Sequence, residues 1–96
     1  MFVGYERIDA DATVKTVAAL NIPTDATSAE IQADGGDVLY TMDNATDPSI
    51  IPRGMVLPNG AGPFEFMIPD LRRIRFCGRA AAGSALNLHY YKGGNA

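Results

Sequence analysis

Apolar and polar residues alternate with a period of two along most of this chain, and helical periodicity is nearly absent. Such alternation is typical of strands that bury one face and expose the other. Residues 13–20 fit either a strand or one or two helical turns, and any helix there must end before Pro23. The remaining alternating segments predict strands at 2–8, 28–34, 38–42, 54–57, 64–68, 74–77 and 86–91.

Turn-forming residues separate these strands. Gly35-Gly36 lies between the two clearest alternating segments and predicts a tight hairpin, because glycine readily adopts positive φ values. Residues 43–48 and 59–63 are rich in Asp, Asn, Gly and Pro, which is the composition of turns. Short strands at this spacing predict an all-β fold: a single compact antiparallel β-sandwich of seven or eight strands, immunoglobulin-like or jelly-roll-like.

The chain's 96 residues supply one domain, 1–96, with a loose tail expected from about residue 92. Apolar residues make up 47% of the chain, which is enough for one packed core. Without tryptophan, this core must be filled by aliphatic side chains, phenylalanine and tyrosine. The inward side of the alternation predicts the core residues Ala29, Ile31, Val38, Tyr40, Leu57, Phe64, Phe66, Ile74, Phe76, Leu86 and Leu88.

The formal net charge of −3 hides an uneven distribution. Residues 1–48 carry nine acidic residues against two basic ones, whereas residues 49–96 carry six basic residues against two acidic ones. Acidic and basic strands could neutralise each other within one molecule, or opposite charges on neighbouring copies could attract. With Cys77 as its single cysteine the domain has no internal disulfide, and oligomerisation is a common remedy for the marginal stability of small domains.

Catalytic chemistry has few candidate residues. The only histidine, His89, lies in an alternating strand, and no serine occupies a nucleophile elbow. Cys77 could pair with His89 if their strands were neighbours, since both are expected on outward faces. No helix N-terminus is predicted that would lower the pKa of Cys77. We therefore expect a protein that is not an enzyme and has no catalytic residues.

The acidic pairs in the predicted loops could supply oxygen ligands to calcium, but none belongs to a complete calcium-binding loop. We therefore expect no metal and no cofactor. No apolar stretch approaches the roughly 20 residues of a membrane span, and the acidic N-terminal segment is unlike a signal peptide, so no membrane partner is expected. The acidic pairs are Asp9 with Asp11, Asp34 with Asp37, and Asp43 with Asp47.

The one basic cluster of the sequence could bind nucleic acid, but the overall pI of about 4.8 argues against that partner. We expect instead a contact with an acidic protein surface, because arginine is favoured at interfaces. The alternation also places several apolar residues on outward faces. The candidate interface residues are therefore the basic cluster Arg72, Arg73, Arg75 and Arg79, the loop acids Asp43 and Asp47, and the outward apolar residues Val3, Leu39, Met67 and Tyr91.

The order of these segments resembles that of a known group of proteins. An alternating strand ending in Gly-Gly is followed by V-x-Y-T-x-D, an Asp-Pro turn and a short G-M-x-L strand. An aromatic-rich strand, an I-R-F strand and a final A-L-N-L-H-Y-Y complete the order. Over residues 17–91 the chain is similar to the small β-sandwich virion proteins of tailed bacteriophages, found among head-decoration, head-fibre and head–tail structural proteins.

This resemblance implies a non-enzymatic virion structural protein, a capsid decoration or cement protein or a spike-base subunit, that stabilises the particle through protein–protein contacts. Its partners would be further copies of itself, with a trimer as the first expectation, and a major capsid or other virion protein. It would be located in the virion after assembly in the cytoplasm of the bacterial host.

An alternative comes from a second resemblance. Residues 38–48 are similar to the Y-T-x-D-G-x-x-P turn of chitobiase-type immunoglobulin-like domains, with Asn44 in place of the glycine and Pro48 one position late. This similarity implies a carbohydrate-associated binding module. Without tryptophan, tyrosine is the aromatic residue expected to contact a sugar in such a module.

Overall fold

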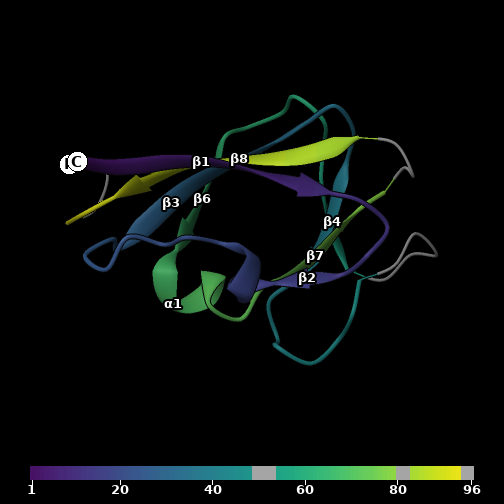
Figure 1. The fold of residues 1–96 in the computed structure, drawn as a ribbon, viewed down its shortest axis with the longest axis horizontal. Helices are drawn as coiled ribbons and strands as arrows, with labels where there is room; N and C mark the ends of the chain where they lie inside the picture. Colours follow the sequence, from purple (N-terminus) through teal and green to yellow (C-terminus); the bar gives the residue numbers. More distant parts are fainter. Residues whose placement is uncertain (49–53, 80–82, 94–96) are drawn as a thin grey trace.

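A computed structural model describes residues 1–48, 54–79 and 83–93 of the chain. Eight strands within these residues form two four-stranded sheets (Figure 1), and every strand pair is antiparallel. The predicted all-β fold of seven or eight short strands is therefore confirmed. The strands are β1 (Phe2–Ala10), β2 (Lys15–Thr16), β3 (Ser28–Asp34), β4 (Val38–Thr41), β5 (Met55–Leu57), β6 (Phe64–Met67), β7 (Arg75–Gly78) and β8 (Ser84–Tyr91).

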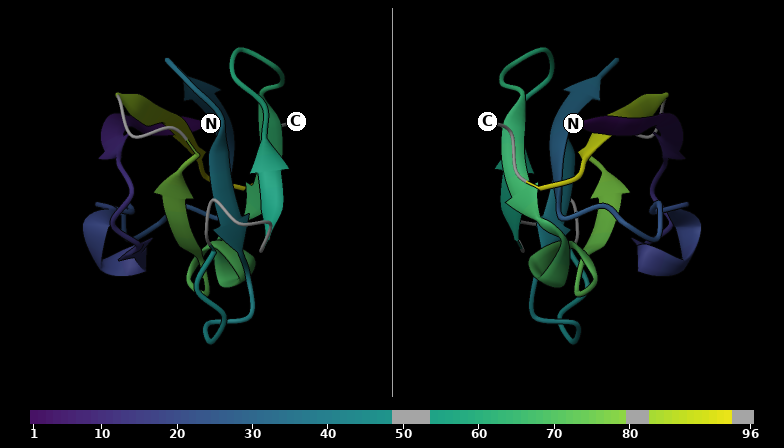
Figure 2. Two further views of the ribbon diagram at one scale, coloured as in Figure 1. Left: turned by 90° about the vertical axis from the view of Figure 1, so that its right-hand side faces the viewer. Right: turned by 90° about the vertical axis from the view of Figure 1, so that its left-hand side faces the viewer.

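The first sheet has the strand order β1-β8-β3-β6, and the second has the order β2-β7-β4-β5. Each sheet therefore has two edge strands: β1 and β6 in the first, and β2 and β5 in the second. Figure 2 shows β5, in teal, on the opposite side of the molecule from β1, in purple.

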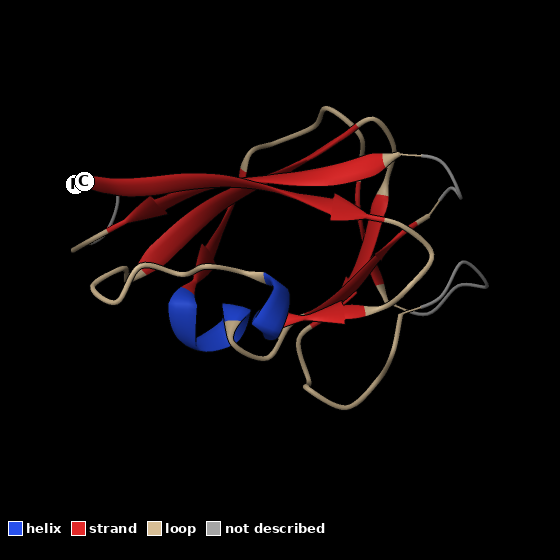
Figure 3. Cartoon of the chain, viewed as in Figure 1, coloured by secondary structure: helices blue, strands red, loops and turns tan. Residues whose placement is uncertain are grey.

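Two short helical segments interrupt the strands (Figure 3). Residues 13–20, predicted as either a strand or a short helix, contain one of each. The strand β2 is followed by a 3-10 helix, η1 (Val17–Ala19), that ends before Pro23. The alternation does not predict the second segment, α1 (Ile68–Leu71). Proline in the first turn of α1 cannot donate to a strand ladder, which is consistent with the end of β6 at this point.

The inner faces of the two sheets share one core. Ile31 and Leu88 from the first sheet belong to the same cluster as Val38 and Phe76 from the second, and all four are fully buried. Burying a large apolar side chain contributes roughly 1.5–3 kcal/mol, so this shared layer holds the sheets together. The predicted core residues confirmed as buried are Ala29, Ile31, Val38, Leu57, Ile74, Phe76, Leu86 and Leu88, while Tyr40 and Phe66 are partly buried against the cluster.

The predicted hairpin at Gly35-Gly36 is wrong. β3 pairs with β6 and β8, whereas β4 pairs with β5 and β7, so the two glycines carry the chain from one sheet to the other. Gly35 has a φ of +79°, and a Cβ atom on it would lie 2.6 Å from the backbone carbonyl oxygen of Gly83. Glycine is therefore needed at position 35 for the turn and for the close passage past the residue that precedes β8.

Phe64 is a second correction, because it is 40% exposed although it was predicted in the core. It pairs with the fully buried Ile31, so its side chain does face inward as the alternation predicts. However, β6 is an edge strand, and the second sheet does not fully cover its inner face. Met55 on the edge strand β5 is in the same situation: it pairs with the inward-facing Tyr40 and is 64% exposed.

The first residue of the chain is hydrogen-bonded to the segment that follows β8. The amino group of Met1 donates to the carbonyl of Lys92 (3.0 Å), and the backbone N–H of Lys92 donates to the carbonyl of Met1 (2.8 Å). Lys92 is thus hydrogen-bonded to the first residue of the chain, although a loose tail was expected to begin at about residue 92. Residues 94–96 of that tail lie outside the described residues.

Replacing the buried Phe76 by alanine should lower the free energy of unfolding by about 3–5 kcal/mol, because it leaves a cavity in the shared core. Phe2→Ala is the matched control: Phe2 is 52% exposed, so the same deletion should cost about 1 kcal/mol or less. Urea denaturation followed by circular dichroism measures both losses. A loss for Phe76→Ala no larger than that for Phe2→Ala would contradict the described packing.

Candidate functional site

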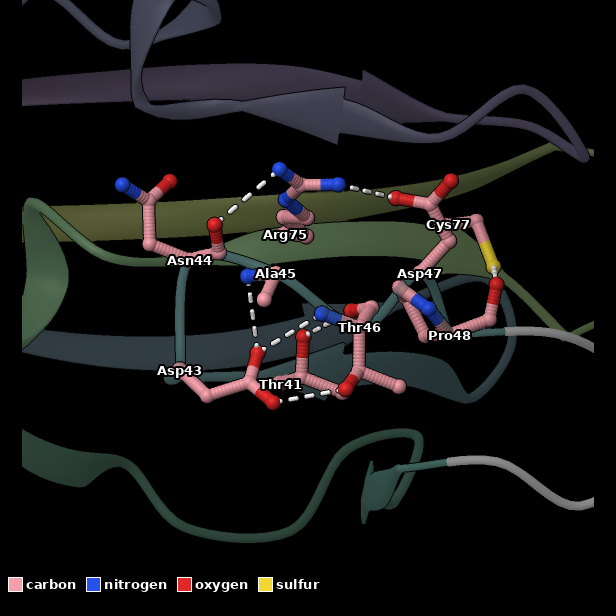
Figure 4. Close-up of polar contacts among 9 residues, drawn as sticks. All are labelled: Thr41, Asp43, Asn44, Ala45, Thr46, Asp47, Pro48, Arg75 and Cys77. Atoms are coloured by element: carbon pink, nitrogen blue, oxygen red, sulfur yellow. Dashed lines mark hydrogen bonds and ion pairs between the residues drawn. The ribbon is translucent and has the colours of Figure 1, made fainter.

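Residues 43–48 form a loop that is organised by Asp43 (Figure 4). Oδ1 of Asp43 accepts hydrogen bonds from the backbone N–H groups of Ala45 (3.0 Å) and Thr46 (2.9 Å), and Oδ2 accepts one from Oγ1 of Thr46 (2.6 Å). These bonds, that of the Thr46 hydroxyl first, stabilise the carboxylate and lower the pKa of Asp43 to about 2. One side chain therefore shapes the predicted turn.

Arg75 on β7 fastens this loop to the second sheet. Its Nη1 lies 2.7 Å from Oδ1 of Asp47, and its Nη2 donates to the carbonyl of Asn44 (3.1 Å). Thr41 on β4 adds another tie, since its Oγ1 donates to the carbonyl of Thr46 (2.6 Å). Two of the candidate interface residues, Arg75 and Asp47, thus pair with each other within the chain.

The end of the loop covers the outer face of the second sheet. Pro48 is fully buried, and its carbonyl accepts a hydrogen bond from the Cys77 thiol at an S···O distance of 3.6 Å. Leu39 pairs with Cys77 across the sheet and is only 4% exposed. The prediction that Leu39 is an exposed apolar residue is therefore wrong, because the chain itself lies over this face.

Two of the four candidate arginines form no ion pair with another described residue. These two, Arg72 and Arg73, follow α1 directly and are exposed. Arg79, in contrast, lies 3.3 Å from Oδ2 of Asp37. Of the basic cluster, Arg72 and Arg73 therefore keep their charges available for a partner.

Ion pairs link the acidic and basic halves of the chain. Of the four ion pairs between described residues, three join residues 1–48 to residues 49–96. This arrangement agrees with the first interpretation of the charge distribution, neutralisation within one molecule. Exposed pairs of this kind contribute only about 0–1 kcal/mol each. The three pairs are Asp47 with Arg75, Asp37 with Arg79, and Asp25 with Lys92, and the fourth joins Arg7 to Asp34.

His89 and Cys77 lie on opposite sides of the core. His89 is exposed on the outer face of the first sheet, whereas Cys77 is buried under the 43–48 loop on the outer face of the second. Their strands are therefore not neighbours, and the two side chains cannot act as a nucleophile and its base. Burial raises the pKa of the Cys77 thiol, and the charge of Asp47 raises it further, which disfavours the reactive thiolate.

Of the acidic pairs considered as calcium ligands, Asp34 and Asp37 are engaged in other contacts. Oδ2 of Asp34 lies 2.9 Å from Nη1 of Arg7, and Oδ1 of Asp37 accepts a hydrogen bond from the N–H of Asn59 (2.8 Å). Within the described part of the chain, no group of three or more His, Cys, Asp or Glu side chains is placed to hold a metal ion.

The outer face of the first sheet carries exposed aromatic rings. Tyr5 and Phe2 on β1 are 56% and 52% exposed, and their rings contact the His89 ring edge to face at centroid distances of 5.4 and 5.2 Å. A shallow depression of about 110 Å³ lies beside His89. We call this surface the aromatic face. The depression is lined by Glu30, Gln32, Pro63, Asn87 and His89.

The two sheets leave a gap at the side formed by the edge strands β5 and β6. Met55, Val56 and Phe64 are 64%, 41% and 40% exposed there. Two grooves of about 340 and 430 Å³ open at this side, and both are lined by Tyr40 and Phe66, whose ring centroids are 5.4 Å apart. We call β5, β6 and these two grooves the open edge.

The remaining outward apolar candidates differ in exposure. Met67 is 49% exposed, and Tyr91 is half-buried with its ring 6.0 Å from that of Phe2. Val3 packs against the core, because the register of β1 shifts between Phe2 and Gly4. The prediction of Val3 as an outward residue is therefore wrong.

Sequence reasoning missed two exposed residues of the open edge, Met55 and Val56. The available signal was the segment 54–57, a predicted strand without charged residues between Pro52 and Pro58, because proline is typical of edge strands and strand ends. Such a strand is expected to be an edge, and an edge without charge is a surface for pairing.

Comparison of the chain with protein families, with curated proteins and with solved structures finds no match. Neither of the helical segments in the described residues has the length and apolar character needed to cross a membrane. The function is therefore inferred from the surfaces described above.

The hydrogen bonds to Asp43 should make the stability of the protein depend on pH. Because the pKa of Asp43 is about 2 in the folded chain and 3.8 ordinarily, the stabilisation is complete above about pH 4 and is lost as the pH falls through 2. Carboxyl NMR titration should give this low pKa, and Thr46→Val, which removes the largest contribution, should raise it. A wild-type Asp43 that titrates near 4 would contradict the described loop.

The Arg75 contacts should protect the Cys77 thiol. Arg75→Met removes the ion pair with Asp47 and the bond to Asn44, so the loop should open more often and alkylation of Cys77 should accelerate by about three- to tenfold. Arg7→Met, which removes a different ion pair, is the matched control and should leave the rate unchanged. Equal rates in wild type and Arg75→Met would show that the loop is held by other contacts.

Proposed function

We propose that this chain is a non-enzymatic structural protein that acts through protein–protein contacts, as a capsid decoration or cement protein or a spike-base subunit of a bacteriophage virion. The observation that carries the proposal is the open edge, where the inward-facing Met55 and Phe64 are left exposed. Apolar side chains gathered on one surface are typical of sites that a partner covers. The virion setting rests on the resemblance of residues 17–91 to small virion proteins of tailed bacteriophages.

The exposed arginines support docking on an acidic protein surface. Arg72 and Arg73 lie next to each other after α1, and neither is neutralised by an ion pair with a described residue. Charges at the rim of a contact steer association and fix orientation, while apolar burial supplies most of the affinity. The proposed partners are further copies of this chain and a major capsid or other virion protein, in particles assembled in the cytoplasm of the host.

The positions of His89 and Cys77 support a non-enzymatic role. The core separates the two side chains, and burial of Cys77 keeps its thiol from reacting. A nucleophile needs a base within hydrogen-bond reach. Neither residue has the other as such a partner.

The aromatic face supports a second candidate function, a carbohydrate-binding module. Exposed rings such as those of Phe2 and Tyr5 can pack on the apolar face of a sugar. The depression beside them presents Glu30, Gln32 and Asn87, whose carboxylate and amide groups can bond to hydroxyls.

The proposed function predicts that the chain binds virion particles through its exposed arginines. The particles are bacteriophage heads assembled from a major capsid protein, and binding is measured by co-sedimentation. Reversing both Arg72 and Arg73 to Glu should weaken binding about tenfold while the free energy of unfolding changes by less than about 0.5 kcal/mol. His89→Gln, on the outer face of the first sheet, is the control and should bind like the wild type.

Failure of the wild-type chain to bind any particle would contradict the proposed function. A hydrolytic or transfer activity that His89→Gln abolishes in a folded protein would contradict the non-enzymatic role. Binding to a glycan array that Tyr5→Ala abolishes, together with no binding to particles, would establish the second candidate instead.

A further inference from the structure

We infer that the open edge binds a second copy of this chain, with β5 of each copy pairing antiparallel to the other about a two-fold axis at Val56. The inference rests on the proposed function, because it names one partner of a protein that acts through contacts. Two observations support it: the distribution of charged residues over the four edge strands, and the residues that line the two grooves.

β5 is the least protected of the four edges. β1 carries Arg7 and Asp9 and has a register shift, β6 carries Glu65, and β2 carries Lys15. Charges and irregularities are among the features that keep an edge from pairing with another chain. Met55–Leu57 contains no charge and no proline and pairs regularly with β4. An apolar edge without protection is expected to be covered.

The absence of charge on β5 suits a second copy in particular. Two-fold pairing places a strand opposite itself, so a charge on the strand would lie close to its own equivalent. With Val56 on the axis, Met55 of each copy lies opposite Leu57 of the other, and every pair in the ladder is apolar. β6, in contrast, would bring two copies of Glu65 into one short ladder. Self-pairing is therefore favoured at β5.

This pairing would also cover the residues that the sandwich leaves open. Met55 and Leu57 face inward, because they pair with the inward-facing Tyr40 and Val38 of β4. A second copy adds its own β5 beside them and extends the second sheet to eight strands. The edge strands β6 of the two copies then approach each other above the joint. Met55 and Phe64 of both copies would thus lose their contact with water.

The contact is small, so we expect it to be weak. Ten residues line the two grooves, against roughly 20–30 on each side of a standard interface. The free dimer is therefore expected to form only in concentrated protein. On a particle that holds many copies, the same contact would be strengthened by the high local concentration.

The two-fold contact gives a dimer, whereas the resemblance to virion proteins implies a trimer first. Each chain has one β5, and mutual pairing of two β5 strands uses both. A trimer would have to be held by another surface. The oligomeric state and the position of the contact therefore test the inference separately.

Disulfide trapping locates the contact. In a Cys77→Ser background, Val56→Cys should form a disulfide-linked dimer when about 0.1 mM protein is oxidised, because opposite residues of an antiparallel pair lie within disulfide reach. Tyr5→Cys is the matched control: it is similarly exposed but lies on β1, and it should cross-link at least tenfold more slowly. Without oxidation, Val56→Lys should weaken association at least tenfold by sedimentation, whereas Phe2→Lys should not.

Cross-linking of Val56→Cys no faster than that of Tyr5→Cys would overturn the inference, as would Val56→Lys without effect on association. If either of these results is found for a chain that binds particles or forms a trimer, the inference of a β5 dimer is wrong, but the proposed function is still supported. If the chain neither self-associates at about 1 mM nor binds particles, both fail. Rapid Val56→Cys cross-linking of a chain that binds no particle would support the dimer and contradict the virion role.

Discussion

The burial of the inner faces of both sheets in one layer is the interaction on which the rest of the structure depends. Ile31 and Leu88 on one side and Val38 and Phe76 on the other leave no room for water between the sheets. Six of the seven connections between consecutive strands of the described residues therefore cross from one sheet to the other, and only β4 and β5 are neighbours both in the sequence and in a sheet. Gly35-Gly36 makes one such crossing, past Ser84. The layer does not reach the open edge, where the same kind of side chain stays exposed.

Strands and their inward faces could be predicted from the sequence, but strand partners could not. The alternation of residues 28–34 and 38–42 correctly identifies Ile31 and Val38 as buried. It carries no information on whether the two strands pair with each other, because a tight glycine turn serves a hairpin and a crossing equally well. The predicted burial of Phe64 is wrong for a related reason. The local alternation correctly gives the direction of its side chain, but its exposure depends on how far the second sheet extends over β6.

The candidate site was harder to predict, because its groups meet only in the folded chain. Arg75 and Asp47 are 28 residues apart in the sequence, and nothing local indicates that they pair. The alternation correctly places Leu39 on the outer face of its sheet, yet the chain near Pro48 covers this face. Three parts of the surface stay exposed in the folded chain and are available to a partner. They are the aromatic face, the two arginines after α1 and the open edge.

Hydrogen exchange along the chain tests most directly whether the open edge is a contact surface. Amide exchange would be compared by mass spectrometry in dilute protein, in concentrated protein and in protein bound to particles. The account predicts that the peptide containing β5 exchanges more slowly in the concentrated and bound samples, while β1 stays unchanged, because pairing satisfies the free edge of β5. Exchange of β5 that is the same in all three samples would contradict it.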